Sequence, residues 1–174
     1  EKTMNLKGIG PYLFGNVIGE GTFSIVRLCY IDKKLFQSSD SKDDSDNPQD
    51  QVQEEKYFAA KIISRNKLKT CKVVEERFET EIRIMQQLHH PGVVQIVDLY
   101  KDSNFYFVIL EFCPHGNLYQ YVVRHENGRL GEEEAKPIFR QILETIQYLH
   151  SIRISHRDMK LENILLDEYD NVKI

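Results

Sequence analysis

Apolar and polar residues alternate near the start of the chain and predict two strands joined by a turn. The segment "YLFGNVIG" at 12–19 is followed by "EGTFS", which contains a second closely spaced glycine. Beyond this turn Val26, Leu28 and Tyr30 recur at a period of two, as expected for a strand with one buried face. We therefore expect a strand, a glycine-containing turn and a second strand over residues 12–31.

The next predicted strand is separated from these two by an acidic stretch. Residues 38–56, "SSDSKDDSDNPQDQVQEEK", are polar and show no periodicity, which indicates a solvated loop rather than an interaction tail. Residues 57–63, "YFAAKII", are apolar except for Lys61 and indicate a buried strand.

Helical periodicity appears in residues 74–88, which end at the breaker sequence "HHPG". The apolar stripe of this predicted helix consists of Val74, Phe78, Met85 and Leu88. Glu81 falls on the same stripe. A buried carboxylate is costly unless a cation pairs with it, so we expect Glu81 to have a basic partner.

Two further strands and two helices follow. The segments 93–100 and 105–112 are apolar runs separated by "KDSN" and predict a hairpin. "CPHG" at 113–116 predicts a break and a hinge, and a short helix is expected at about 117–124.

Residues 132–151 predict a long amphipathic helix with three glutamates near its positive N-terminal end. Pro137 is unfavourable inside a helix, at a cost of about 3 kcal/mol, so we expect a kink or a later start. The final segment, "NILLDEYDNVKI", predicts two short strands around an Asp/Asn turn.

Composition limits the classes of function. The chain has 174 residues, 41% of them hydrophobic, which suffices for a core. Its net charge of −4 and pI near 5.9 give no global basic field for nucleic acid or an anionic membrane, so phosphate binding must be local.

The cysteines, the chain ends and the apolar runs bear on the cellular location. Cys29, Cys71 and Cys113 are odd in number and widely spaced, which indicates reduced thiols rather than disulfides or a zinc site. No apolar run approaches the roughly 20 residues of a membrane helix, and no signal peptide opens the chain. We expect a cytoplasmic protein, with the nucleus also possible, and a sequence that is cut at both ends.

The glycine-containing segment "IGEGTFSIV" at 18–26 has several interpretations. It is an ordinary hairpin turn, a dinucleotide-binding loop, or a flap whose amides lie over phosphates. A dinucleotide loop requires a helix directly after it, whereas the pattern here predicts a strand. Lys61 alone is best explained as a sheet-edge lysine, but pairing with Glu81 would hold its ammonium toward nucleotide phosphates.

The strongest chemical signal is "ISHRDMKLENILL" at 154–166, where polar side chains crowd between two apolar runs. Taken alone, His156 could be a hydrogen-bonded core histidine and Arg157 a surface charge. Asp158, Lys160 and Asn163 together fit phosphoryl transfer: a carboxylate to accept a hydroxyl proton, a cation to offset phosphoryl charge, and an amide oxygen for Mg²⁺.

Residues 156–163 resemble the catalytic loop H-R-D-L-x-x-x-N of eukaryotic protein kinases, with Met159 in the leucine position. A glycine-rich loop, a strand lysine, a helix glutamate and a hinge precede it in the family's order, so the resemblance covers nearly the whole chain from Tyr12. It implies an α+β, two-lobed kinase-like fold, with an N-terminal antiparallel sheet plus one helix and the start of a mostly helical C-terminal lobe. The implied divisions are an extension at 1–11, the N-terminal lobe at 12–113 with the insertion 38–56, and the hinge with the beginning of the C-terminal lobe at 114–174.

The resemblance also implies a role for individual residues. Asp158 would be the catalytic base, Lys160 would lie near the γ phosphate, Asn163 would bind magnesium, and Lys61 held by Glu81 would contact the α and β phosphates. Residues implied in ATP binding are Ile18, Gly19, Glu20, Gly21, Thr22, Phe23, Ser24, Val26, Ala59, Lys61, Leu110, Glu111, Cys113 and Leu165. Ser24 stands where the family's flap has its third glycine.

Substrate class follows from the same resemblance. Lys160, two residues after the aspartate, is similar to serine/threonine kinases, and the helix and hinge look most like the calmodulin-dependent and AMP-activated group. Glu162 matches a position that often recognises a basic residue of a peptide substrate, although Asn117 replaces a second acid found in many relatives. We expect a protein substrate with a Ser or Thr hydroxyl, ATP and Mg²⁺ as cofactors, and no nucleic acid.

Two alternatives to an active kinase remain. The family's Asp-Phe-Gly segment would begin just beyond Ile174. We therefore expect the 174 residues alone to be inactive and partly unfolded. One alternative function is a scaffold that binds nucleotide without catalysis. A dinucleotide-dependent oxidoreductase is the other, and ATP rather than NAD binding would exclude it. Cys113 is either a reactive thiol or a small packing residue.

Overall fold

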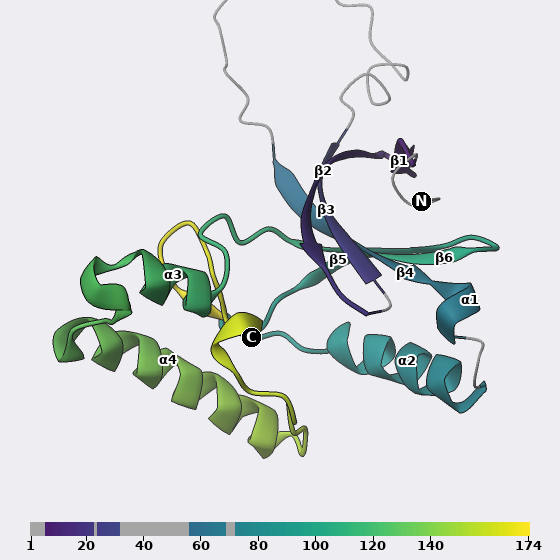
Figure 1. Cartoon of the computed structure of the whole chain (residues 1–174). Coiled ribbons are helices and arrows are strands. Elements are labelled where there is room, and N and C mark those ends of the chain that lie inside the picture. The colour runs from purple at the N-terminus through teal and green to yellow at the C-terminus, as the bar shows by residue number, and fades with distance from the viewer. Residues whose placement is uncertain (1–5, 23, 32–55, 69–71) are drawn as a thin grey trace, which may run out of the picture. The chain divides into compact units, whose positions relative to one another are not determined.

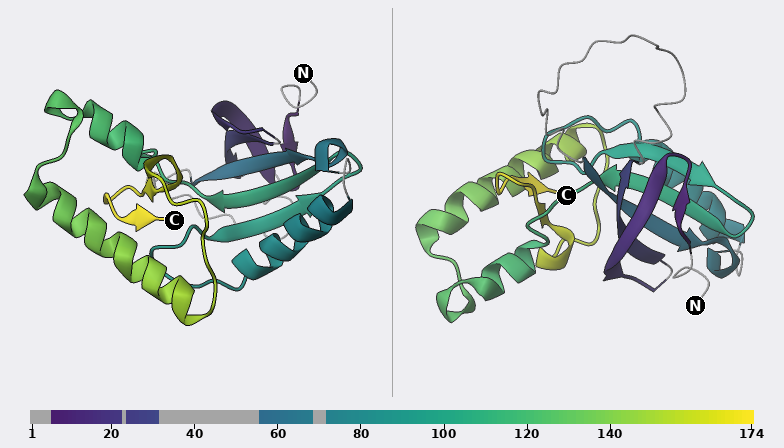
Figure 2. Two further views of the ribbon diagram at one scale, coloured as in Figure 1. Left: turned by 60° about the horizontal axis from the view of Figure 1, so that its bottom comes forward. Right: turned by 90° about the horizontal axis from the view of Figure 1, so that it is seen from above.

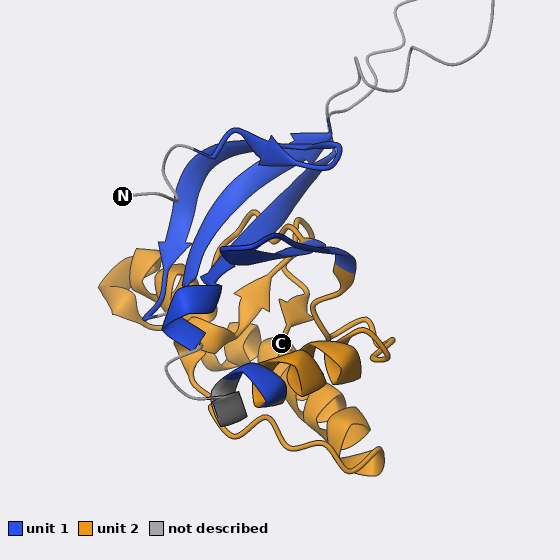
Figure 3. Cartoon of the chain, turned by 90° about the vertical axis from the view of Figure 1, so that its right-hand side faces the viewer, with its two compact units in different colours: residues 1–76, 97–110 blue, residues 77–96, 111–174 orange. Residues whose placement is uncertain are grey.

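The computed structural model describes residues 6–22, 24–31, 56–68 and 72–174 (Figure 1). The chain forms two compact units, shown in different colours in Figure 3. Unit 1 comprises residues 1–76 and 97–110, and unit 2 comprises residues 77–96 and 111–174. Residues 38–55 of the predicted acidic loop, together with Phe23 and Cys71, lie outside the described residues.

A six-stranded sheet forms most of unit 1 and confirms the strands predicted from the alternating pattern. Its spatial order is β1-β2-β3-β4-β6-β5, and the pairs β1·β2, β2·β3 and β3·β4 are antiparallel. The neighbouring positions of β5 and β6 fit the predicted hairpin. The bounds are β1 Gly8–Ile9, β2 Tyr12–Glu20, β3 Ser24–Ile31, β4 Tyr57–Ser64, β5 Ile96–Lys101 and β6 Phe105–Glu111, and the one-turn helix α1, Arg65–Leu68, follows β4.

The core of unit 1 lies on one face of this sheet. Successive side chains of a strand point to opposite faces, and in β4 the alternate residues Phe58, Ala60 and Ile62 belong to the core. Lys61 lies between two of them and is exposed. The buried cluster consists of Tyr12, Phe14, Cys29, Phe58, Ala60, Ile62, Phe105, Phe107 and Ile109.

The N-terminal residues take part in the sheet. Gly8 and Ile9 pair with Leu13 and Tyr12, so β1 is an added edge strand. Arg27 of β3 donates from Nε to Gly15 O at 2.9 Å and from Nη1 to Leu6 O at 2.8 Å. Gly15 lies in a register shift of β2 between Phe14 and Val17, where the ladder of hydrogen bonds is interrupted. Part of the segment predicted as an extension is therefore packed on the sheet.

The helix predicted at 74–88 is α2, Lys72–Met85, which begins two residues earlier and ends three residues earlier than predicted. The prediction that Glu81 lies on a buried stripe is wrong: Glu81 is exposed, whereas Ile82 is 6% exposed. In a helix, residues three and four positions after Phe78 both lie near its face. These positions are Glu81 and Ile82, and the apolar Ile82 is the one that is buried.

Residues 77–85 of α2 belong to unit 2, which also contains two further helices and a short hairpin, as predicted. The helices are α3, Leu118–Arg124, and α4, Glu132–Ser151, and the hairpin consists of β7, Leu165–Leu166, and β8, Val172–Lys173. Short 3₁₀ turns cover Glu126–Gly128 and Leu161–Asn163. Because α4 begins at Glu132, the predicted later start at Pro137 is wrong. The Glu134 carboxylate accepts from Gly131 N–H at 3.0 Å, which satisfies one free amide at the start of α4.

The cores of unit 2 are built around α4. Ile138 and Ile142 of α4 pack with Leu118, Ile164, Leu166 and Val172, so the β7–β8 hairpin, yellow in Figure 2, lies beside the helix. A second cluster joins Leu88, Val93 and Leu149. No helix in the described part of the chain is long and apolar enough to cross a membrane.

Candidate functional site

The predicted catalytic loop of unit 2 brings three polar side chains together. Lys160 Nζ lies 3.0 Å from Asp158 Oδ2, and Asn163 Nδ2 donates to the same oxygen at 2.8 Å. Asn163 Nδ2 also donates to the Asp158 backbone carbonyl at 2.8 Å. Asp158, Lys160 and Asn163, which sequence reasoning selected, therefore form one hydrogen-bonded group.

Buried neighbours hold the C-terminal end of this loop. Ile164 and Leu166 are 4% and 0% exposed, and Ile164 O accepts from Leu118 N at 2.7 Å. Within the loop, Asn163 N donates to Lys160 O at 3.0 Å. Arg157 has a φ of 67°, a left-handed conformation that non-glycine residues seldom adopt and that turns the chain immediately before Asp158. The apolar residues after the loop thus fix its polar side chains.

The charges in the loop keep Asp158 ionised. Hydrogen bonds from Lys160 first, and from Asn163 second, lower the pKa of the Asp158 carboxyl below its ordinary value. An ionised carboxylate can accept a proton from a nearby hydroxyl group. The Lys160 ammonium retains donors for an anionic ligand, because an ammonium has three N–H groups.

Asn163 has the donor chemistry of a magnesium ligand. Its Nδ2 is used by Asp158, which leaves the carbonyl oxygen Oδ1 for another partner. Mg²⁺ prefers oxygen ligands, so the orientation of this amide fits the predicted role. Among the residues that the structure describes, no group of three or more His, Cys, Asp or Glu is arranged to hold a metal ion.

The glycine-rich segment of unit 1 is a hairpin. Gly21 N donates to Ser24 O at 2.8 Å and Ser24 N donates to Gly21 O at 3.3 Å, with Thr22 exposed between them. Strand β3 follows directly, so the helix that a dinucleotide-binding loop requires is absent at residues 24–31. This local structure favours the flap over the dinucleotide loop. Glu20 ends β2 and is exposed.

Four neighbouring strands, β2, β3, β4 and β6, carry the other predicted nucleotide residues of unit 1. Val26 of β3 is the register partner of Gly19 on one side and of Lys61 on the other. Ala59 occupies the next same-face position of β4, opposite Leu28, and is 8% exposed. Ile18 is exposed and Leu110 is half-buried. Lys61 belongs to unit 1 and Glu81 to unit 2, and their ion pair stays a prediction.

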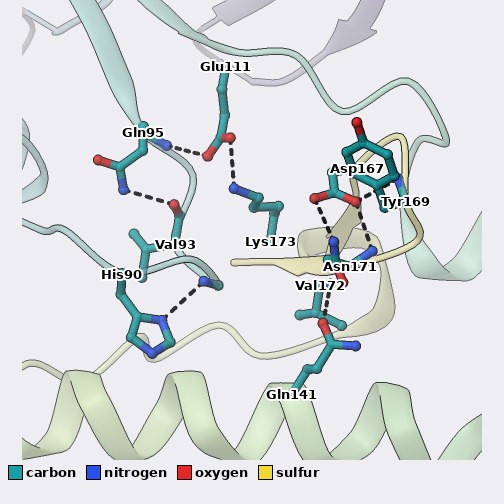
Figure 4. A network of polar contacts seen from close by, with 11 residues as sticks. His90, Val93, Gln95, Glu111, Gln141, Asp167, Tyr169, Asn171, Val172 and Lys173 are labelled. Atoms are coloured by element: carbon teal, nitrogen blue, oxygen red, sulfur yellow. Dashed lines mark hydrogen bonds and ion pairs between the residues drawn. The ribbon is translucent and has the colours of Figure 1, made fainter.

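A polar network in unit 2 includes Glu111, two residues before the predicted hinge at 113–116 (Figure 4). Lys173 Nζ lies 2.8 Å from Glu111 Oε2, and Glu111 Oε1 accepts from Gln95 N at 2.7 Å. Sequence reasoning missed Lys173, because 62 residues separate it from Glu111 and no local pattern links them. Near the same hinge, Leu165 forms a bridge with Asn117.

Cys113 is a buried thiol of this hinge. Burial first, and the Glu111 charge second, raise the pKa of Cys113 to about 12. Its 8% exposure fits a packing role better than a reactive thiol. Cys29 and Cys113 are both free.

Comparison with known proteins gives matches over nearly the whole chain. The protein kinase domain family matches residues 12–174. The chain is 34% identical over 168 residues to the Hormonally up-regulated neu tumor-associated kinase homolog A of Xenopus laevis, covering 97% of this chain and 21% of that protein. It is 32% identical over 173 residues to the Probable serine/threonine-protein kinase fhkD of Dictyostelium discoideum, covering 99% and 20%. It is 32% identical over 177 residues to the Serine/threonine-protein kinase cds1 of Schizosaccharomyces pombe, covering 100% and 34%.

The chain belongs to the protein kinase domain family, and the fold predicted from the sequence is confirmed. Serine/threonine kinases are among its relatives, which supports a kinase function. The chain spans about a fifth to a third of the length of these relatives.

Proposed function

We propose that the protein transfers the γ-phosphoryl group of ATP to Ser or Thr hydroxyls of protein substrates. The observation that carries this proposal is the group formed by Asp158, Lys160 and Asn163, in which an ionised carboxylate, an ammonium and an amide oxygen lie within one short loop. Serine/threonine kinases among the relatives support the same substrate class.

Each side chain of this loop has a defined part in the reaction. The Asp158 carboxylate accepts the proton of the substrate hydroxyl as its oxygen forms a bond to the γ phosphorus. The bond from that phosphorus to the β–γ bridging oxygen breaks, and ADP leaves with the electron pair. The Lys160 ammonium offsets the charge on the transferring phosphoryl oxygens, and its hydrogen bond orients the carboxylate.

Magnesium would be held in part by Asn163 through Oδ1, the amide atom that Asp158 does not use. When bound, Mg²⁺ would supply positive charge that offsets the negative charge of the phosphates. The bond from Asn163 to Asp158 couples the metal ligand to the proton acceptor, so one rigid loop would position both.

Nucleotide binding is proposed for both units. In unit 1 the glycine-rich hairpin and Lys61 would contact the phosphates, and the ladder that joins Gly19, Val26 and Lys61 gives these residues a common support. In unit 2 the backbone groups of Glu111 and Cys113 would contact the adenine edge. Glu81 is proposed as the partner of Lys61.

The finer assignments are part of the same proposal. We place the protein in the cytoplasm, with the nucleus possible, and in the calmodulin-dependent or AMP-activated kinase group. A scaffold that binds nucleotide without catalysis is the alternative. The intact polar group around Asp158 favours the enzyme, since a scaffold has no need of a proton acceptor.

Phosphorylation by the intact protein tests the proposal. The protein is incubated with labelled ATP, Mg²⁺ and peptide mixtures that offer Ser, Thr or Tyr, and Asp158→Asn is compared with Glu168→Gln. Glu168 is an exposed acid of the β7–β8 turn and serves as the matched control. General-base catalysis contributes about 10²–10⁴-fold, so we expect Asp158→Asn to lose at least roughly 100-fold in kcat while ATP binding persists.

Three outcomes would separate the alternatives. Transfer to Ser and Thr by the wild type and the control, but not by Asp158→Asn, supports the proposal. Binding of ATP without transfer in the wild type supports the scaffold. Binding of NAD in preference to ATP would contradict both.

A further inference from the structure

We propose that Lys173 is a positioning residue for nucleotide binding, because its ion pair with Glu111 fixes the backbone of the hinge segment, residues 111–116. This inference rests on the proposed function, in which that backbone contacts the adenine edge. Lys173 is not among the nucleotide-binding residues predicted from the sequence. We expect it to act through Glu111 without contacting the nucleotide.

Both carboxylate oxygens of Glu111 are engaged. Oε2 pairs with Lys173 Nζ at 2.8 Å, and Oε1 accepts from Gln95 N at 2.7 Å. The backbone of Glu111 makes a further bond, since its N–H donates to Gln95 O at 3.0 Å. The first hinge residue is thus tied through its side chain and its main chain to the same neighbour, as Figure 4 shows for the side-chain bonds.

Lys173 is itself firmly held. It belongs to β8 and pairs with Leu165 across the β7–β8 hairpin. The next residue, Ile174, donates to Gly92 O at 2.8 Å and accepts from Val94 N at 3.0 Å. Residues 92–95 therefore bind the end of the β8 segment on one side and Glu111 on the other. The Lys173–Glu111 ion pair connects β8 directly to Glu111.

The pair is shielded from water, which distinguishes it from the other lysine pairs of unit 2. The side chains of Lys173 and Glu111 are 13% and 27% exposed, whereas Lys136 and its partners Glu132 and Glu133 are 59%, 82% and 89% exposed. Exposed pairs contribute little because water and salt screen them, but a shielded charge that loses its partner is strongly disfavoured. Loss of the Lys173 ammonium should therefore draw Glu111 toward water and move the hinge.

The other contacts of the hinge segment hold its later residues: Gly116 O accepts from Leu166 N at 2.9 Å, and His115 Nδ1 lies 2.6 Å from Asp170 Oδ1. Gly116 N donates to Cys113 O at 3.2 Å, and Cys113 is buried. These contacts fix the middle of the segment, so the position of its first residue depends on Gln95 and Lys173. A shift of Glu111 would misplace backbone groups for adenine without changing Asp158, and KM for ATP should rise while kcat is retained.

The test is steady-state kinetics and ATP binding with the intact protein. Lys173→Met removes the charge and keeps the side-chain length, Glu111→Gln keeps an acceptor for Gln95, Lys173→Arg keeps the ion pair, and Lys136→Met is the matched control. We expect KM and Kd for ATP to rise about tenfold in the first two variants, with kcat within about twofold. A tenfold change corresponds to about 1.4 kcal/mol. The Arg variant and the control should stay within about twofold of the wild type.

Hydrogen exchange supplies a second measurement that does not need catalysis. The amides of Glu111 and Cys113 should exchange faster in Lys173→Met and Glu111→Gln, and not in Lys136→Met. If Lys173→Met fails to fold, Glu111→Gln decides the question. Unchanged ATP affinity in a folded variant, or a fall in kcat at constant KM, would overturn this inference and leave the proposed function intact. A wild-type protein that binds no ATP would overturn the proposed function as well.

Discussion

An alanine at position 92 should destabilise unit 2 through one steric contact. A Cβ built on Gly92 would overlap Thr145 Oγ1 and would lie 3.0 Å from Thr145 Cβ and 3.2 Å from Thr145 Cγ2. Thr145 is 1% exposed, and its hydroxyl donates to Gln141 O at 2.8 Å within α4. Rotating Thr145 about χ1 would break its hydrogen bond to Gln141 O and leave its Cβ 3.0 Å from the added carbon, so full relief requires Gly92 and α4 to move apart.

The magnitude follows from the cost of overpacking, which is about 1–3 kcal/mol for added methylene groups in a packed interior. For a domain of about 150–250 residues 1 kcal/mol corresponds to roughly 2–4 °C in Tm, so Gly92→Ala should lower Tm by roughly 2–12 °C. Thr145→Ala removes both the hydroxyl and the methyl group that the new Cβ would meet. The double variant should therefore recover at least about 1 kcal/mol relative to the sum of the single changes.

Thermal unfolding of the four proteins, followed by circular dichroism and a fluorescent dye, provides the measurement. Gly131→Ala is the control, because the nearest atom to its added Cβ is the flexible Glu134 Oε2 at 3.4 Å. The control should cost less than about 1 kcal/mol, as expected for a helix N-cap position. A Gly92→Ala protein as stable as the wild type, or strictly additive losses in the double variant, would refute the proposed contact.

Two further predictions concern titration. Lys160→Met should move the acid limb of the kcat/KM profile to higher pH, because the hydrogen bond from Lys160 is the largest cause of the lowered pKa of Asp158. In the wild type the active carboxylate exists above this lowered pKa and is lost as pH falls through it, so an unchanged limb would mean that another group titrates. Cys113, with its pKa raised to about 12, should react with iodoacetamide at pH 8 about two to three orders of magnitude more slowly than in the urea-unfolded protein. Equal rates before and after unfolding would contradict the burial of this thiol.

Elements with long, regular patterns were predictable from the sequence. Residues 132–151 form α4 as predicted, because apolar spacing and the three initial glutamates agree. The short strand β1 was not predicted, since two residues carry no period and only pairing with β2 defines them. Glu81 was placed on the wrong face because spacings of three and four both suit a helix, and only packing distinguishes them.

Residues of the candidate site were predictable where they lie close together in the sequence, and not where only the fold brings them together. Asp158, Lys160 and Asn163 were found because a short loop keeps them close in sequence. Lys173 was missed because its partner Glu111 lies far away in the chain. The shared support of Gly19, Val26 and Lys61 was also out of reach, since it depends on the register between strands.

The hydrogen bonds from Arg27 to Leu6 O and Gly15 O have a practical consequence for shortened versions of the protein. The family match begins at residue 12, and a clone started there would lose the outermost strand and one acceptor of the guanidinium. The base of the glycine hairpin would then be held by fewer bonds. Expression boundaries for biochemical work should accordingly be drawn upstream of Leu6, even though the family match alone would exclude those residues.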